Sequence, residues 1–176
     1  MAFTYGAFVA SVREAVRQDE TGDALAKVMA DTLADPAAVA KTVPPQDEDE
    51  IHLFEDEAVS IWSCRFQPDV VMPAHEHKMP AWIGVFAGAE KNIIYKREGG
   101  GLEEVRTTVV RPGELLMIGD DQIHAVTAEG PEPSHALHVY LGPLTKIERE
   151  LFDWESGEAV SFTMDNFEKM KKSKRE

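Results

Sequence analysis

The chain has 176 residues and a formal net charge of −14, and 43% of its residues are hydrophobic, a composition typical of one globular domain with its own core. A surface this acidic repels nucleic acid and anionic lipid, so we expect neither as a partner. No apolar run reaches the roughly 18 residues of a membrane helix, which excludes a membrane-spanning protein of the helical kind.

A cytoplasmic location is the expectation from two further features. The first residues, MAFTYGAFVASVREAVRQDE, lack the basic stretch, apolar run and cleavage site of a signal peptide. The chain has one cysteine, Cys64, so no intramolecular disulfide can form. Cys64 lies in an apolar run and is predicted to be a small buried residue rather than a nucleophile.

Residues 3–41 show the period of amphipathic helices, with a break at Asp35-Pro36. In two segments, apolar residues recur at positions that share one face of a helix. These are Phe8, Val9, Val12, Ala15 and Val16 in the first segment and Leu25, Val28, Met29 and Leu33 in the second. Residues 1–45 are therefore predicted to be a helical segment that packs on the rest of the fold and carries no chemistry.

The pattern changes after a proline-rich acidic connector at residues 43–50. Short apolar or alternating runs follow, each bounded by glycine, proline or aspartate. They lie near residues 51–54, 58–66, 70–73, 81–86, 92–97, 105–110, 114–118, 123–127 and 136–141. Many short strands at regular spacing indicate a sandwich or a barrel, so residues 46–145 are predicted to form an all-β barrel.

The segment after Leu144 returns to a helical pattern over residues 146–151. The chain then ends in a charged stretch, KMKKSKRE, which is predicted to fray. Residues 146–176 are thus expected to form a C-terminal segment and a charged tail.

Three of the six histidines form a candidate metal site. His75 and His77 are two residues apart, and the side chains of a strand alternate, so both imidazoles point to the same face. A Pro112-Gly113 turn and an apolar run lead to His124, which a barrel that winds back on itself brings beside the first pair. Imidazole suits Fe, Zn, Ni and Cu alike, so this set indicates a divalent transition metal without naming it.

This arrangement resembles the two motifs of the cupin superfamily. The matching residues are His75-Glu76-His77 with Gly88 after them, then Pro112-Gly113 and His124. The resemblance implies an all-β fold with flanking N-terminal helices, built on the cupin double-stranded β-helix, a jelly-roll barrel. The glutamate of the first cupin motif is absent, because residues 78–82 read KMPAW, and this leaves a three-histidine set.

Within the cupins, the three-histidine set resembles the thiol dioxygenases, the cysteine dioxygenase-like family. The run HALHVY, residues 135–140, looks like that family's late Ser-x-His-x-Tyr strand, and residues 85–90 resemble its bacterial members. The likeness covers roughly residues 55–145. It implies two catalytic residues, Tyr140 with its hydroxyl toward the metal and His138 supporting the tyrosine.

Two positions depart from that family. Ala136 stands where the family has a serine, and no Arg or Lys lies between residues 42 and 64, where the family's substrate-clamping arginine would fall. His52 is the one candidate cation in that stretch. These departures are typical of an uncharacterised branch of the family.

The resemblance implies a non-haem Fe(II) oxidoreductase. Such an enzyme adds both atoms of dioxygen to a small thiol and gives a sulfinic acid, with Fe(II) as its only cofactor. The thiol binds the metal as thiolate, because the charge of the metal lowers the thiol pKa. Barrel edges of this kind often pair, so a homodimer is one assembly open to the chain.

Two other hypotheses stay open. One is a metal-dependent cupin of different chemistry, such as a non-thiol dioxygenase, an isomerase or a zinc or manganese hydrolase. The other is a non-catalytic cupin that binds a small ligand. Plainer interpretations also exist for single residues. The histidines and the tyrosine of the proposed site can be core residues, His135 faces away from His138 or lies in the preceding turn, and His52 is a surface or a pocket residue. Glu90 is solvated, structural or an inward carboxylate near the metal. Three arginines are solvated strand residues or reach the mouth of the barrel, namely Arg65, Arg97 and Arg106.

Overall fold

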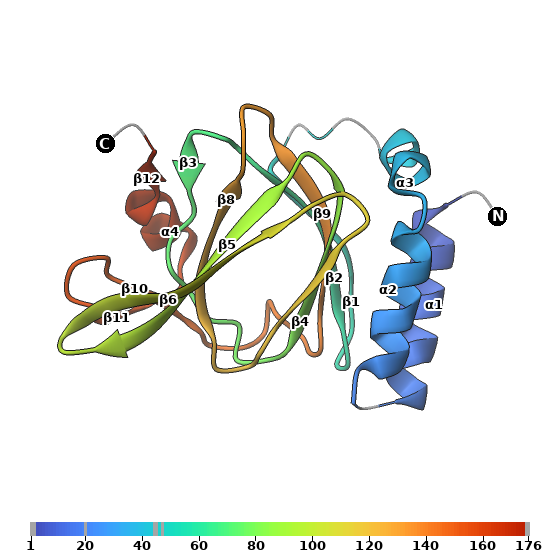
Figure 1. Cartoon of the computed structure of the whole chain (residues 1–176). Helices are drawn as coiled ribbons and strands as arrows, with labels where there is room; N and C mark the ends of the chain where they lie inside the picture. The colour runs from blue at the N-terminus through green and yellow to red at the C-terminus, as the bar shows by residue number, and fades with distance from the viewer. Residues whose placement is uncertain (1–2, 20, 44–45, 47, 175–176) are drawn as a thin grey trace.

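The computed structural model of the chain describes residues 3–19, 21–43, 46 and 48–174 (Figure 1). Residues 44, 45 and 47 of the predicted connector and residues 175 and 176 of the predicted tail lie outside these ranges. Within them, no helix has the length and apolarity needed to cross a membrane.

Three helices come first in the chain: α1 (Tyr5–Gln18), α2 (Asp23–Leu33) and α3 (Pro36–Thr42). Side chains set the starts of two of them. Thr4 accepts a hydrogen bond from the Ala7 amide at the start of α1, and Asp35 accepts one from Ala38 at the start of α3. The predicted helices and the break at Asp35-Pro36 are confirmed, and the residues after the break form a third helix.

Two antiparallel sheets make the barrel. The larger has the order β1-β2-β9-β4-β7 and the smaller the order β6-β5-β8. The bounds are β1 (Glu50–Glu55), β2 (Ser60–Phe66), β4 (Ala81–Ala87), β5 (Glu90–Glu98), β6 (Gly101–Val110), β7 (Leu115–Ile118), β8 (Ile123–Ala128) and β9 (Ser134–Tyr140). The chain crosses between the two sheets from β4 to β5, from β6 to β7, from β7 to β8 and from β8 to β9, and β9 returns between β2 and β4. Two facing antiparallel sheets joined in this way form a double-stranded β-helix, a jelly-roll barrel, as predicted.

The larger sheet has two buried faces. In β9, Leu137 and Val139 pack with the helices, whereas Ala136 and Tyr140 pack inside the barrel. Figure 1 shows α1 and α2 side by side and α3 beyond one end of α2, all on the outer side of this sheet. Gly84 of β4 lets α2 approach closely, because a Cβ at that position would lie 2.4 Å from a methyl carbon of Leu33. The helices thus cover one face of the sheet and leave the other to line the barrel.

The predicted helix at 146–151 is wrong. Residues Glu150–Phe152 form β10, which pairs with β11 (Ala159–Ser161). The Phe152 amide also donates a hydrogen bond to the Ala74 carbonyl, at 2.8 Å. Leu151 and Phe152 are both buried but belong to different apolar clusters, as alternate residues of a strand do. Pairing with distant segments therefore overrides a short helical pattern.

The prediction of a frayed tail is also wrong for residues 169–174. A fourth helix, α4 (Met164–Met170), is followed by β12 (Lys172–Ser173), which pairs with β3 (Val70–Val71). The buried ring of Phe167 anchors α4 on the barrel. A charged stretch is thus held in place because an apolar side chain and a strand edge lie beside it (Figure 1).

Candidate metal centre

The backbone joins two of the three candidate ligands. His75 and His124 each donate their amide to the other's carbonyl, with N···O distances of 2.9 Å, in an isolated antiparallel bridge. His77 follows on the same extended segment between β3 and β4, and His124 belongs to β8. The structure therefore brings together the three histidines that the sequence singled out.

The three Nε2 atoms point at one another. Nε2 of His77 lies 3.1 Å from Nε2 of His75 and 3.1 Å from Nε2 of His124. On the far side of the rings, His75 Nδ1 is 2.8 Å from the Pro73 carbonyl oxygen, and His124 Nδ1 is 2.9 Å from Asn92 Oδ1. Because these oxygens only accept, Nδ1 carries the proton in both rings and the Nε2 lone pair faces the centre.

Burial keeps the three imidazoles neutral. Desolvation lowers the pKa of His75 to about 4. It also lowers the pKa values of His77 and His124 well below their usual range, and neighbouring histidines add to the effect. Neutral imidazole is the form that binds a metal, so the set is ready to act as a ligand at ordinary pH.

This donor set fits a transition-metal ion. With lone pairs on Nε2 of His75 and His124, a proton on His77 Nε2 can satisfy only one of them. One cation between the nitrogens satisfies all three together, and the ligand atoms lie within 4.8 Å of one another. His75, His77 and His124 are therefore the residues that would hold a metal.

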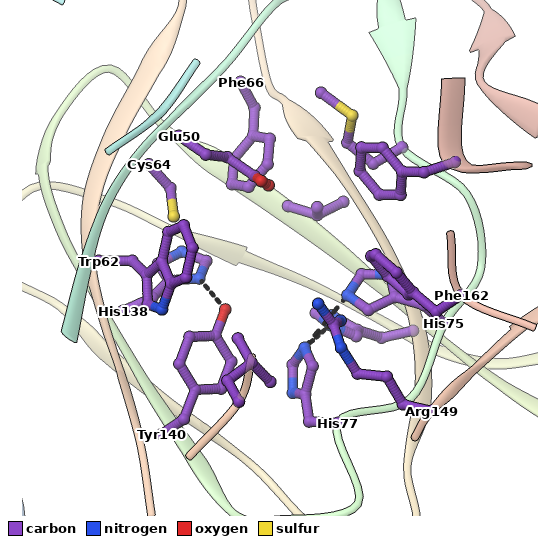
Figure 2. Close-up of a pocket in the computed structure, with 15 residues that line it drawn as sticks. Glu50, Trp62, Cys64, Phe66, His75, His77, His138, Tyr140, Arg149 and Phe162 are labelled. Carbon is purple, nitrogen blue, oxygen red and sulfur yellow. Dashed lines mark hydrogen bonds between the residues drawn. The ribbon is translucent and has the colours of Figure 1, made fainter. Parts of the chain in front are cut away.

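Tyr140 and His138 face the interior from β9, on the same side of the strand as predicted. Tyr140 Oη lies 3.2 Å from His138 Nδ1 (Figure 2). The Tyr140 ring meets the His77 ring edge to face, with centroids 4.9 Å apart. Burial raises the pKa of Tyr140 well above its usual range, so its hydroxyl stays protonated beside the histidines.

A buried carboxylate and amide continue this network from β5. Glu90 Oε2 lies 3.2 Å from His138 Nε2, and Asn92 Nδ2 donates to Glu90 Oε1 at 2.8 Å. Both side chains are inaccessible to solvent, which excludes a solvated Glu90 and leaves the interpretations of Glu90 as a structural residue or an inward carboxylate. Alternate residues of β5 are buried from Glu90 to Ile94, and this period of two was the signal in the sequence.

The histidines, Tyr140 and Glu50 line one cavity of about 50 Å³. Its apolar walls come from Trp62, Phe66, Met72, Val126, Leu144, Phe162 and Phe167. Figure 2 shows Arg149 reaching into the same cavity, and its guanidinium carbon lies 3.5 Å from the centre of the Phe162 ring. Arg149 was not among the candidates from the sequence, because the segment that carries it was predicted to be a helix outside the barrel.

The charge of the cavity depends on two partly desolvated groups. Burial lowers the pKa of Arg149, and the nearby Tyr140 and Glu50 partly offset this decrease. The guanidinium remains charged at any ordinary pH. Desolvation raises the pKa of Glu50, although the residue as a whole is exposed to solvent. The cavity thus offers one fixed cation and one carboxyl group to a small molecule.

The other candidates lie away from this cavity or serve as its wall. Arg65 forms an ion pair with Asp49 at 2.8 Å. Cys64 is buried in the cavity wall, and burial raises its pKa well above the usual range, so the prediction of an unreactive small residue is supported. The remaining three are exposed strand residues, namely His52, Arg97 and Arg106. His135 packs on Phe86, on the opposite side of β9 from His138, as predicted.

Comparison with known proteins gives weak structural matches. No protein-family model matches the chain, and no curated protein matches its sequence. The DMSP lyase DddQ from Ruegeria pomeroyi DSS-3 aligns at 16% identity over 56% of this chain, with a TM-score of 0.46, and the match spans 48% of the lyase.

An uncharacterised double-stranded β-helix protein from Klebsiella pneumoniae subsp. pneumoniae MGH 78578 aligns at 17% identity and a TM-score of 0.44, over 70% of this chain and 86% of its own. Oxalate decarboxylase from Bacillus subtilis aligns at 21% identity with a TM-score of 0.43, and the match covers 53% of this chain and 24% of the decarboxylase chain. Similarity this weak assigns neither a family nor an activity to the chain.

Proposed function

We propose that this protein is a metal-dependent cupin enzyme that oxidises a small carboxylate-bearing thiol to a sulfinic acid with dioxygen, with Fe(II) as the metal. The observation that carries the proposal is the shared cavity: three neutral histidines converge beside a buried tyrosine, and one arginine reaches the same space. The resemblance of the sequence to the three-histidine thiol dioxygenases supports the choice of reaction.

Each residue of the cavity has a task in this proposal. His75, His77 and His124 hold the metal through Nε2. Arg149 binds the carboxylate of the substrate, because a planar guanidinium pairs with a carboxylate through two parallel hydrogen bonds. This local cation matters in a protein with a net charge of −14, which otherwise repels an anionic substrate. The Tyr140 hydroxyl contacts the reacting sulfur group.

The bound ferrous ion would lower the thiol pKa and supply electrons to dioxygen. The overall reaction is R–SH plus O₂ to R–SO₂H, in which sulfur loses four electrons and both oxygen atoms gain them. No further reductant or co-reactant is needed. The aromatic and aliphatic walls around the three histidines exclude water, which protects the reaction from side products.

The size of the cavity limits the substrate. A cavity of about 50 Å³ is too small for a peptide or a nucleotide, so small molecules are the substrates to test. Cysteine, 3-mercaptopropionate and mercaptosuccinate are small molecules that combine a thiol with a carboxylate, whereas cysteamine lacks the carboxylate. Glu50 lies in the same cavity and can pair with an ammonium group, so comparison of the amino and non-amino thiols reports on its role.

The test is oxygen uptake by the purified protein after anaerobic loading with Fe(II), with those four thiols as substrates and mass spectrometry of the product. We expect a sulfinate from at least one carboxylate-bearing thiol and none from the His124→Ala variant. If no thiol supports uptake although one iron is bound per chain, thiol oxidation is excluded, and a metal cupin of other chemistry becomes the better hypothesis.

A further inference from the structure

A single buried hydrogen-bond chain links a candidate metal ligand to the cavity tyrosine. It runs from His124 through Asn92, Glu90 and His138 to Tyr140, with successive donor–acceptor distances of 2.9, 2.8, 3.2 and 3.2 Å. The four residues other than Tyr140 are at most 2% exposed, so water does not compete for these bonds.

We infer that Glu90 is a positioning residue that sets the direction of every hydrogen bond in this chain. The inference rests on the proposed function for its effect on catalysis, but not for its structural content. Asn92 Nδ2 donates to one oxygen of the Glu90 carboxylate, and the second oxygen lies 3.2 Å from His138 Nε2, where a carboxylate oxygen accepts. The Glu90 side chain is completely buried, and two donors are what such a buried carboxylate requires.

One arm of the chain prepares the metal ligand. Because Asn92 must turn its NH₂ group toward Glu90, its Oδ1 faces His124 and accepts the Nδ1 proton. Nε2 of His124 is then left with a lone pair, in the direction of the other two histidines. Partners of this kind hold a ligating histidine in the required tautomer and ring orientation.

The other arm prepares the tyrosine. His138 donates its Nε2 proton to Glu90, so in the neutral ring Nδ1 is an acceptor for the Tyr140 hydroxyl. Tyr140 therefore directs its proton away from the cavity and presents oxygen lone pairs to it. In this orientation Tyr140 accepts a hydrogen bond from the substrate, and the S–H of an incoming thiol is such a donor.

Apart from Tyr140, the neighbouring residue on the interior face of β9 gives His138 no hydrogen-bond partner. Ala136, the neighbouring residue on that face, has no polar atom in its side chain. The acceptor comes instead from β5, a strand of the opposite sheet, at the position where the β4–β5 turn enters the barrel. Glu90 thus couples the two sheets at the site.

The substitution Glu90→Gln tests the inference, because glutamine has one acceptor oxygen where glutamate has two. The glutamine side chain can accept from only one of the two donors, so the hydrogen bonds on one side of residue 90 must change direction. With a metal on Nε2, His124 keeps its proton on Nδ1 and Asn92 keeps its orientation. The change therefore falls on His138, whose proton must move from Nε2 to Nδ1. The Tyr140 proton then turns toward the cavity.

The measurement is ¹⁵N NMR of the histidine rings in protein loaded with Zn²⁺, a diamagnetic probe that imidazole binds. We expect His138 to carry its proton on Nε2 in the parent protein and on Nδ1 in Glu90→Gln. The matched control is Glu98→Gln, an exposed glutamate on the same strand, which leaves the His138 signals unchanged. Identical His138 signals in the parent and Glu90→Gln would overturn the inference.

Two further readouts separate this inference from the proposed function. If the protein oxidises a thiol, Glu90→Gln lowers kcat roughly 10- to 100-fold with little change in KM, and Glu90→Asp recovers part of the loss. If it oxidises none, the proposed function fails while the NMR result still decides the inference. If the protein binds no Zn²⁺, the proposed metal centre is excluded. In the metal-free Glu90→Gln protein, the ring proton of either His138 or His124 must then lie on the other nitrogen than in the parent protein.

Discussion

At the residue scale, the question is how an acidic protein offers a site to an anion. Arg149 is partly buried, lies over the Phe162 ring and shares the cavity with the three histidines. Stacking on an aromatic face holds the guanidinium in place while its edge remains free for a carboxylate. The residue thus supplies a local positive charge at the cavity of a protein whose net charge is −14.

Replacement of Arg149 should therefore weaken the binding of carboxylate-bearing thiols. A charge-assisted hydrogen bond contributes about 1.5–3 kcal/mol, so Arg149→Gln should raise KM for such a thiol roughly 10- to 100-fold. Arg149→Lys keeps the positive charge but loses the planar guanidinium, so its KM should lie between those of the parent protein and Arg149→Gln. Steady-state kinetics with 3-mercaptopropionate measures the effect, and Arg97→Gln is the control on an exposed arginine. An equal loss with cysteamine, which has no carboxylate, would argue against this role.

Much of the site was predictable from residues close in sequence. Alternation along a strand was enough to place His138 and Tyr140 on one face, and motif spacing singled out His75, His77 and His124. Arg149 was not predictable, because its position depends on how the chain after β9 packs against residues 74–76. Glu90 shared its alternating pattern with many solvated strand residues, and only the opposite sheet shows where it points.

At the scale of elements, the β4–β5 turn aligns Glu90 with the interior. Gly88 in this turn has a φ of +66°, and a Cβ there would lie 2.2 Å from the Pro133 carbonyl oxygen. A side chain at this position therefore meets both backbone strain and a rigid clash. The turn can follow its path only because residue 88 is glycine.

The substitution Gly88→Ala should lower the free energy of unfolding by about 2–4 kcal/mol, through strain and clash together. Gly99→Ala is the matched control, since Gly99 has a φ of +62° and nothing within 4 Å of an added Cβ. Gly99→Ala should lower the free energy of unfolding by about 1–2 kcal/mol, the contribution of backbone strain alone. Urea denaturation of both variants gives the comparison. Equal losses in the two variants would mean that the contact with Pro133 is unimportant.

The helix and strand pattern of the barrel was predictable from hydrophobic periodicity, and the C-terminal part was not. The run at 146–151 has helical periodicity, but its backbone groups pair with β11 and with the segment that carries His75. Such pairing joins residues far apart in sequence, so a local pattern carries no signal of it. The charged tail was misjudged for the same reason, because its partner β3 lies some 100 residues earlier.

At the scale of the whole molecule, three histidines buried in neutral form couple stability to pH. In the unfolded chain their pKa is near the ordinary 6.5, whereas in the folded protein the pKa of His75 is about 4, and those of His77 and His124 are also lowered. Between these values the unfolded state binds more protons than the folded state. Stability therefore falls as pH decreases through this window.

We accordingly expect the metal-free protein to lose thermal stability steadily as pH falls from 6.5 toward 4. Differential scanning calorimetry at a series of pH values measures the slope. His124→Asn removes one of the three groups and should make the slope shallower, whereas replacement of the exposed His52 by Asn should leave it unchanged. A melting temperature that does not change over this window would contradict the burial of neutral imidazoles.

The most direct test of the central claim is the origin of the oxygen atoms in the product. Protein loaded with Fe(II) is supplied with its best carboxylate-bearing thiol under ¹⁸O₂, and the product is analysed by mass spectrometry. We expect a sulfinic acid in which both oxygen atoms carry the label, and no such product from His124→Ala. Oxygen consumption without label in the sulfur product would exclude thiol dioxygenation.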